Sequence, residues 1–239
     1  MAILRTEHLG RDVDGKRILD DINLEIAEGE VAAIVGPSGS GKSSLLRLLN
    51  RLDEPTSGAV YLAGQDYRRF APAELRRRVG LVMQTAYLFP GSVAENIRFG
   101  PAQHGELLSA QAVDGLLAQV GLEGFSGREV HNLSGGEAQR VALARALANF
   151  PSAPHEGASG PTPPVLLLDE PTSALDAESK LGIENLISTV VASRRLTCIL
   201  VTHDLQQAGR MAARVALLNS GRLVRTGTIK EVLGAERQS

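Results

Sequence analysis

A glycine-rich segment places the strongest constraint on how this chain can fold. The segment GPSGSGKSS, at 36–44, follows the apolar run VAAIV and opens the helical pattern SSLLRLLNRL. It matches G-x-x-x-x-G-K-[ST] at Gly36, Gly41, Lys42 and Ser43, in the strand–loop–helix order that makes this motif specific. Such a loop curls so that its N–H groups point inward, and the helix N-terminus adds a partial positive charge. The segment therefore predicts a phosphate-binding loop in a nucleotide site.

The loop predicts both the ligand and its counter-ion. We expect Lys42 to bridge the β- and γ-phosphates of a nucleotide and the Ser43 hydroxyl to bind Mg²⁺. The residues expected around the phosphates are Gly36, Pro37, Ser38, Gly39, Ser40, Gly41, Lys42, Ser43 and Ser44.

Two acids and a histidine end two further apolar runs. The run VLLL precedes Asp169 and Glu170, where an unpaired buried charge would be costly. We expect Asp169 to organise Mg²⁺ and Glu170 to polarise the attacking water. The run CILVT precedes His203, which is expected to hold the water, Glu170 and the γ-phosphate in line.

The order of patterns predicts an α/β fold. The buried runs at 31–35, 165–168, 197–201 and 215–218 alternate with helical stretches, which is typical of a parallel sheet flanked by helices. The first sixty residues instead show the alternation ILDDINLEI and turns at DVDGK and AEGE, which favours antiparallel strands. Residues 86–148 are mostly helical, and 149–164 are expected to form a flexible proline-rich loop.

Bulk composition excludes some functions. The net charge is −2, which argues against a nucleic-acid partner because no positive excess is available to neutralise phosphates. The single cysteine, Cys198, lies in an apolar run and is interpreted as a buried packing residue. One basic run is interpreted as a solvated helix face, with contact to anionic lipid or a membrane partner as the alternative: Arg68, Arg69, Arg76, Arg77 and Arg78.

Together these motifs resemble the ATP-binding cassette (ABC) ATPase family over nearly the whole chain. The loop at 36–44 is similar to Walker A, VLLLDE to Walker B, SALD (173–176) to the D-loop, and LSGGE to the family's signature. Gln84 matches the Q-loop glutamine, with roles in catalysis and at the metal, and His203 the switch histidine.

The resemblance implies a P-loop NTPase (RecA-like) core over 1–85 and 149–239, with an N-terminal antiparallel β subdomain. It also implies a small helical ABC-specific lobe over about 86–148.

The signature gives the resemblance its consequence for assembly. In this family two cassettes face each other head to tail, and the signature of one covers ATP held by the other. Ser134, Gly135 and Gly136 begin a helical pattern, so they are expected to offer N–H groups and a hydroxyl to ATP. Because the chain holds one copy of each motif, a symmetric homodimer with two sites is predicted.

One position departs from the family. Its members usually stack an aromatic residue on adenine near the position of Val13, yet no aromatic lies among the first sixty residues. Stacking is worth roughly 1–3 kcal/mol, so weaker ATP binding or relaxed base selectivity is expected. Stacking by Arg11 or Arg17 is the alternative.

The resemblance leaves the transported solute open. The leading hypothesis is the ATPase subunit of a membrane transporter, acting on the cytoplasmic face of a membrane through a separate permease. Two segments favour the branch of putative iron exporters and the plant aluminium-tolerance ATPase associated with UDP-glucose transport. These segments are LNRLDEPTSGAVYLAGQD and LRRRVGLVMQ. The alternatives are a phosphate-type importer ATPase and a soluble ABC ATPase of the iron–sulfur assembly type.

Overall fold

The computed structural model describes residues 2–150, 164–173, 175 and 177–233 and divides into two compact units. The first unit contains residues 2–81, 164–170 and 195–233, and the second contains 82–150 and the described residues of 171–194. Residues 151–163, which make up most of the expected proline-rich loop, lie outside the described residues, as do Ala174 and Asp176 of SALD.

An antiparallel sheet forms the N-terminal part of the first unit. Its strand order is β2-β1-β4-β5. The bounds are β1 Ala2–Val13, β2 Lys16–Ala27, β4 Ser57–Leu62 and β5 Gln65–Asp66. Asp14 and Gly15 join β1 to β2 with φ of 49° and 76°, the left-handed backbone that two-residue hairpin turns need. The predicted antiparallel strands and their turn are confirmed.

A second sheet in the same unit has the order β10-β9-β3-β8-β7-β6. Its strands are β3 Val31–Val35, β6 Val79–Val82, β7 Val165–Asp169, β8 Thr197–Thr202, β9 Arg214–Asn219 and β10 Arg222–Gly227. β3 pairs in parallel with both β8 and β9, β7 pairs in parallel with β8, and β10 returns antiparallel to β9. All the apolar runs predicted to be strands are therefore strands of one sheet.

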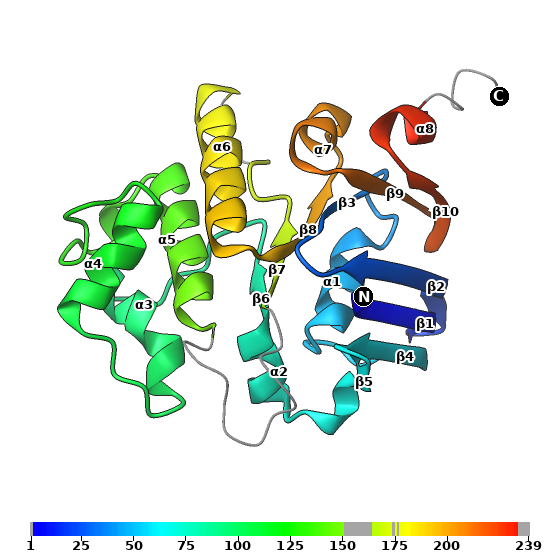
Figure 1. Ribbon diagram of the computed structural model, residues 1–239, viewed down its shortest axis with the longest axis horizontal. Coiled ribbons are helices and arrows are strands. Elements are labelled where there is room, and N and C mark those ends of the chain that lie inside the picture. Colours follow the sequence, from blue (N-terminus) through cyan, green and yellow to red (C-terminus); the bar gives the residue numbers. More distant parts are fainter. Residues whose placement is uncertain (1, 151–163, 174, 176, 234–239) are drawn as a thin grey trace. The chain divides into compact units, whose positions relative to one another are not determined.

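The main core of the first unit lies around helix α1 (Lys42–Leu49). Leu45, Leu46, Leu48 and Leu49 of α1 are fully buried against leucines and isoleucines of the antiparallel sheet and against β3, β7 and β8. Figure 1 shows α1 between the antiparallel strands and the parallel sheet. The remaining helices of the unit are α2 Pro72–Arg78, α7 Leu205–Met211 and α8 Ile229–Leu233, with a short 3₁₀ turn, η1, at Tyr67–Arg69.

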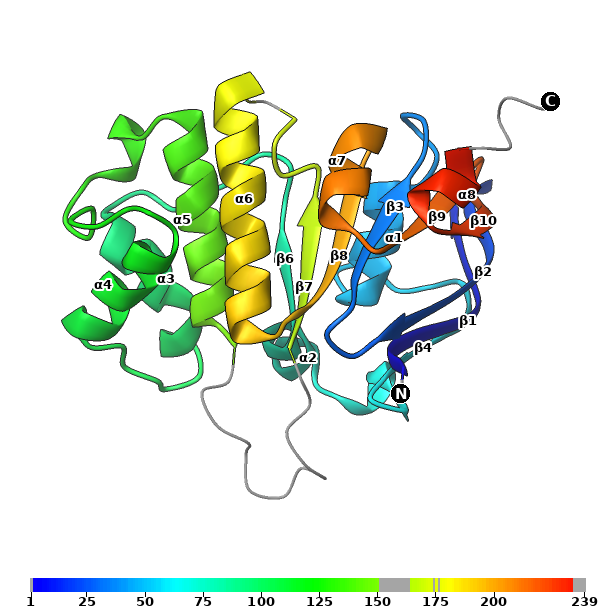
Figure 2. The same cartoon turned by 45° about the horizontal axis from the view of Figure 1, so that its top comes forward.

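The second unit is helical. It contains α3 Val93–Ala102, α4 Ala110–Gln119, α5 Gly135–Ala148, α6 Ala177–Arg194 and the 3₁₀ turn η2 at Val130–Asn132. Helices α3, α4 and α6 all contact α5, and Figure 2 shows α6 running alongside α5. The unit thus includes α6, which follows β7 in sequence.

Two arginines correct one expectation. Arg77 and Arg78 are 6% and 7% exposed, so the interpretation of the basic run as a solvated face is wrong for them. Arg78 binds Glu74 at 2.9 Å and lies over the Phe70 ring, which lets the long side chain cover apolar surface while its charge is paired. Cys198 is buried in β8 as expected, and burial raises the pKa of its thiol to about 12.

Candidate active site

The phosphate loop joins β3 to α1 and has the backbone that its glycines permit. Gly39 and Gly41 have φ of 78° and 103°, values that side chains other than glycine rarely adopt. A Cβ on Gly41 would lie 2.8 Å from Leu19 Cδ2 and 3.0 Å from the Ile18 carbonyl oxygen of β2. The loop therefore needs glycine both for its curl and for its contact with the antiparallel sheet.

The loop offers several groups that suit a phosphate. The first turn of α1 contains no acidic residue, and its N-cap residue Gly41 has no capping side chain. Lys42 is 5% exposed, and its Nζ donates to the carbonyl oxygens of Gly36 and Pro37 at 2.9 Å each. Ser40 Oγ is buried without a hydrogen-bond partner among the described residues. A helix N-terminus, a lysine and an unsatisfied hydroxyl together fit an anion.

Ser43 and Asp169 meet in the first unit. Ser43 Oγ donates to Asp169 Oδ1 at 3.0 Å, although the two residues are 126 apart in sequence. Asp169 is 7% exposed, and burial raises the pKa of its carboxyl while the Ser43 bond lowers it. Hydroxyl and carboxylate oxygens are ligands that Mg²⁺ accepts alongside phosphates and waters.

Glu170 and His203 form a second close pair. Nδ1 of His203 lies 3.0 Å from Oε2 of Glu170. Glu170 has φ of 43°, a left-handed backbone that is strained for a non-glycine residue. Its N–H donates to the Val201 carbonyl oxygen at 2.9 Å, which holds this strained turn against β8. Strain that the surrounding strands maintain is frequent where a side chain must be aimed at a ligand.

Both pairs lie at one edge of the parallel sheet. In register, Asp169 of β7 pairs with Val201 of β8, and Val35 of β3 pairs with Thr202 of β8. The carboxyl ends of β3, β7 and β8 are therefore level, so the loop after β3, the acids after β7 and the histidine after β8 leave the sheet together. Ligands of open α/β sheets bind in this place.

Gln84 lies in the second unit. Its Nε2 donates to Ser173 Oγ at 3.1 Å, and the side chain of Gln139 on α5 donates to the neighbouring Met83 carbonyl oxygen at 3.2 Å. Ser43 and Asp169, which are predicted to bind the metal together with Gln84, belong to the first unit. The glutamine's expected role at the metal therefore stays a prediction.

The signature residues begin α5, as predicted. Ser134 is the N-cap residue, and its Oγ accepts from Glu137 N while Glu137 Oε2 accepts from Ser134 N at 2.7 Å. This capping box satisfies one end of the helix, yet the Ser134 hydroxyl keeps a proton to donate. The first-turn N–H groups at Gly135 and Gly136 have no acceptor inside the helix.

The fold of the second unit does not require these two glycines. A Cβ on Gly135 or Gly136 would approach nothing closer than Leu175 Cδ2, at 3.9 Å. Neither has a left-handed backbone. Their presence therefore needs an explanation other than the packing of this unit.

Sequence reasoning missed some contacts of the site. The serine and glutamate of the capping box, Ser134 and Glu137, could have been recognised from their S-x-x-E spacing. The bond between Gly221 N and the Ser40 carbonyl oxygen, at 3.0 Å, joins the β9–β10 turn to the phosphate loop. No sequence motif predicts that contact, because it depends on how strands far apart in sequence pair.

Comparison with known proteins agrees with this geometry. A family model described as "ABC transporter" matches residues 19–173. ABC transporter I family member 17 from Arabidopsis thaliana is 44% identical over 88% of this chain and 76% of its own length. Protein STAR1 from Oryza sativa subsp. japonica is 44% identical over 88% of this chain but only 58% of its own length. A sulfate/thiosulfate import ATP-binding protein, CysA 2 from Chromobacterium violaceum, is 42% identical over 90% of this chain and 55% of its own length.

Solved structures show the same fold. The dimeric ATP-binding cassette MJ0796 bound to ADP and Pi has a TM-score of 0.78 and 31% identity, over 95% of this chain and 98% of that one. CbiO1 from Clostridium perfringens, part of the transporter complex cbiONQ, has a TM-score of 0.84 and 31% identity, over 99% of this chain and 92% of that one. Among the described helices of the present chain, none combines the length and the apolar character needed to cross a membrane.

Proposed function

This chain belongs to the ABC transporter family as an ATP-binding, ATP-hydrolysing component, and we propose that it powers a separate membrane permease. The observation that carries the proposal is the pairing of Ser43 with Asp169 and of Glu170 with His203 at the carboxyl ends of neighbouring strands. A phosphate loop, a metal-suited oxygen pair and a carboxylate–histidine pair are the parts that phosphoryl transfer to water needs.

The phosphate-loop residues hold the triphosphate in this proposal. Lys42 leaves the carbonyl oxygens of Gly36 and Pro37 and donates to the β- and γ-phosphates. Ser43 and Asp169 would hold Mg²⁺, which would neutralise charge that develops on the phosphate oxygens. Gln84 keeps the role in catalysis and at the metal that the family resemblance implies.

Glu170 and His203 activate water. Glu170 accepts a proton from water as the water oxygen attacks the γ-phosphorus, and the bond to the ADP oxygen breaks. His203 positions the Glu170 carboxylate through Nδ1, which leaves Nε2 to contact the γ-phosphate. The strained backbone of Glu170 supports this role, because such strain is frequent where a side chain must be positioned.

A second copy completes each site. The first-turn N–H groups at Gly135 and Gly136 and the Ser134 hydroxyl suit a γ-phosphate, and the glycines have no role in packing their own unit. A twofold dimer would place this helix start against the ATP of the partner copy. The dimeric MJ0796 structure supports this assembly. The chain then acts at the cytoplasmic face of a membrane through its permease.

The solute belongs to the permease, because the site described here recognises only a nucleotide. The similarity to ABC transporter I family member 17 and Protein STAR1 supports the branch of putative iron exporters and UDP-glucose-associated ATPases. The relatives named for sulfate/thiosulfate import keep importer function as the second candidate.

Copurification from the native cell tests the transporter role. The full chain is tagged and solubilised gently, and its partners are identified beside its ATPase activity. A multi-span membrane protein is the expected partner, recovered in greater yield with Glu170→Gln and ATP, which would slow release. Recovery of soluble partners alone, with ATPase activity intact, would contradict the transporter role and favour a non-transport ABC ATPase.

A further inference from the structure

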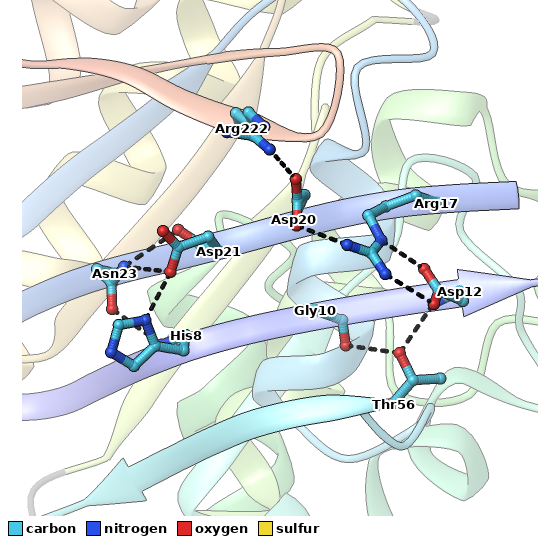
Figure 3. Close-up of polar contacts among 9 residues, drawn as sticks. All are labelled: His8, Gly10, Asp12, Arg17, Asp20, Asp21, Asn23, Thr56 and Arg222. Atoms are coloured by element: carbon cyan, nitrogen blue, oxygen red, sulfur yellow. Dashed lines mark hydrogen bonds and ion pairs between the residues drawn. The ribbon is translucent and has the colours of Figure 1, made fainter.

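The side chain of Arg17 is clamped by two carboxylates beside the phosphate loop. Its Nε and Nη2 donate to Oδ1 and Oδ2 of Asp12 at 2.9 and 3.2 Å, and its Nη1 donates to Oδ1 of Asp20 at 3.0 Å. Figure 3 shows this arrangement, with Arg222 of β10 binding Asp20 from the other side. Each of the three guanidinium nitrogens therefore has an acceptor.

These bonds fix the orientation of a flat group and leave its faces open. Guanidinium N–H bonds lie in the plane of the group, so acceptors at its edges do not cover its two faces. The Arg17 side chain is 60% exposed. Two carboxylates also neutralise its charge, and they raise the pKa of Arg17, so it stays a cation. What Arg17 presents to a ligand is thus a held planar surface more than a free positive charge.

Backbone contacts tie this surface to the phosphate loop. The Asp20 N–H donates to the Gly221 carbonyl oxygen at 2.8 Å, and the Gly221 N–H donates to the Ser40 carbonyl oxygen at 3.0 Å. Ile18 follows Arg17 in β2, about 3.3 Å further along the strand. Its carbonyl oxygen lies so close to Gly41 that a Cβ on that glycine would be 3.0 Å away. Backbone hydrogen bonds therefore join the clamp to the phosphate loop within the first unit.

We propose that the Arg17 guanidinium is the stacking surface for the base of a nucleotide whose phosphates occupy the loop. This inference rests on the proposed nucleotide site. No Phe, Tyr or Trp lies among the first 60 residues. The one ring in that stretch, His8, binds Asp21 Oδ1 at 2.7 Å and lies away from Arg17 in Figure 3. Bases stack on arginine planes as they do on aromatic rings. Arg11 is placed differently, because its Nη1 binds the Glu54 carbonyl oxygen at 2.6 Å.

Stacking without hydrogen bonds to base edges does not distinguish bases, since every base has a π face. Three of the five N–H groups of Arg17 bind Asp12 and Asp20. All five lie in the guanidinium plane, so none points at the edge of a base that stacks on its face. The nucleotide site therefore takes purine nucleotides broadly, and adenine and guanine nucleotides bind it with similar affinity.

Calorimetric titration of the full chain with MgADP, MgGDP and magnesium pyrophosphate tests this inference without hydrolysis. Arg17→Lys keeps the charge beside Asp12 and Asp20 and removes the plane. It is expected to weaken MgADP and MgGDP binding about ten-fold and to leave pyrophosphate binding unchanged. The wild-type dissociation constants for MgADP and MgGDP are expected to agree within about three-fold, since stacking is base-tolerant.

The matched control is Arg222→Ala. It removes another arginine from Asp20 and leaves the Arg17 clamp in place, so nucleotide binding is expected to stay at the wild-type level. Melting temperatures of both variants establish that they fold.

Three results would overturn the inference. These are unchanged MgADP binding in Arg17→Lys, an equal loss for MgADP and pyrophosphate, or an equal loss in Arg222→Ala. A wild-type preference for ADP over GDP of more than about ten-fold would overturn its base tolerance. Failure of the wild-type chain to bind either pyrophosphate or ADP would instead reject the proposed nucleotide site itself.

Discussion

Ser43 Oγ donates a 3.0 Å hydrogen bond to Asp169 Oδ1 and so joins the start of α1 to the end of β7. This bond uses only part of the hydrogen-bonding capacity of the Asp169 carboxylate, and Asp169 is only 7% exposed. Burial consequently raises the pKa of Asp169 above its usual value. Without a cation, the ionised carboxylate is a cost to the fold that is tolerated because the site needs it.

Asp169→Asn should stabilise the metal-free chain at neutral pH. A carboxyl whose pKa is raised in the folded state favours folding at low pH, and that contribution is lost as pH rises through the folded pKa. The neutral amide avoids this loss, and a gain of about 1 kcal/mol would raise Tm by roughly 2–4 °C. Differential scanning calorimetry at pH 7.5 and pH 4 measures the effect, which should shrink at the lower pH. A lower Tm of the variant at pH 7.5 would contradict this prediction. The variant should also lose Mg²⁺-dependent ATPase activity.

Glu170→Gln should slow ATP hydrolysis while keeping ATP binding. A positioned general base contributes about 10²- to 10⁴-fold, and glutamine retains the shape and the contact with His203 but cannot take a proton. Phosphate release and equilibrium binding measure the two effects separately. More than a tenth of wild-type turnover in this variant would exclude Glu170 as the base.

Gly135→Ala should impair ATP hydrolysis without disturbing the fold. The added Cβ meets only Leu175 Cδ2, at 3.9 Å, so Tm should not fall, whereas a partner copy approaching ATP at this helix start would be blocked. ATPase activity is expected to drop at least ten-fold, about 1.4 kcal/mol.

The matched control is Gly115→Ala in α4 of the same unit, where a Cβ meets nothing within 4 Å. Alanine in place of a helical glycine should stabilise by roughly 0.5–1 kcal/mol, with ATPase activity retained. Equal activities of the two variants would count against a second copy at Gly135.

Val13→Tyr should tighten ATP binding. Val13 is 40% exposed at the end of β1, opposite Lys16 in the hairpin. A ring here would add stacking worth about 1–3 kcal/mol. Titration of both chains with MgADP decides the matter, and an unchanged dissociation constant would show that the base does not reach this strand end.

Cys198 should resist thiol reagents in the folded chain. Burial raises the pKa of its thiol to about 12, so the reactive thiolate is scarce at pH 8. Labelling with a chromogenic disulfide at pH 8 is expected to be slow and to become fast in denaturant. Rapid labelling of the native chain would mean that β8 opens readily.

Much of the fold could be read from local patterns. The run VAAIV followed by GPSGSGKSS predicted β3, the phosphate loop and α1, because glycine spacing and apolar periodicity act within a few residues. The alternation of ILDDINLEI predicted the antiparallel sheet for the same reason. The basic run shows the limit of such patterns, since Arg77 and Arg78 are buried although their charges predicted a solvated helix face.

By itself the sequence determined the phosphate loop, the acids after a buried strand, the histidine after another and the signature at a helix start. These depend on short spacings, which fix local backbone and the order of elements. Only the tertiary structure decided which of these residues meet. Parallel register brings Asp169 and His203 to one sheet edge, and the β9–β10 turn joins Asp20 to Ser40 through Gly221. Such contacts span up to about two hundred residues along the chain and arise only when the sheets pair and pack.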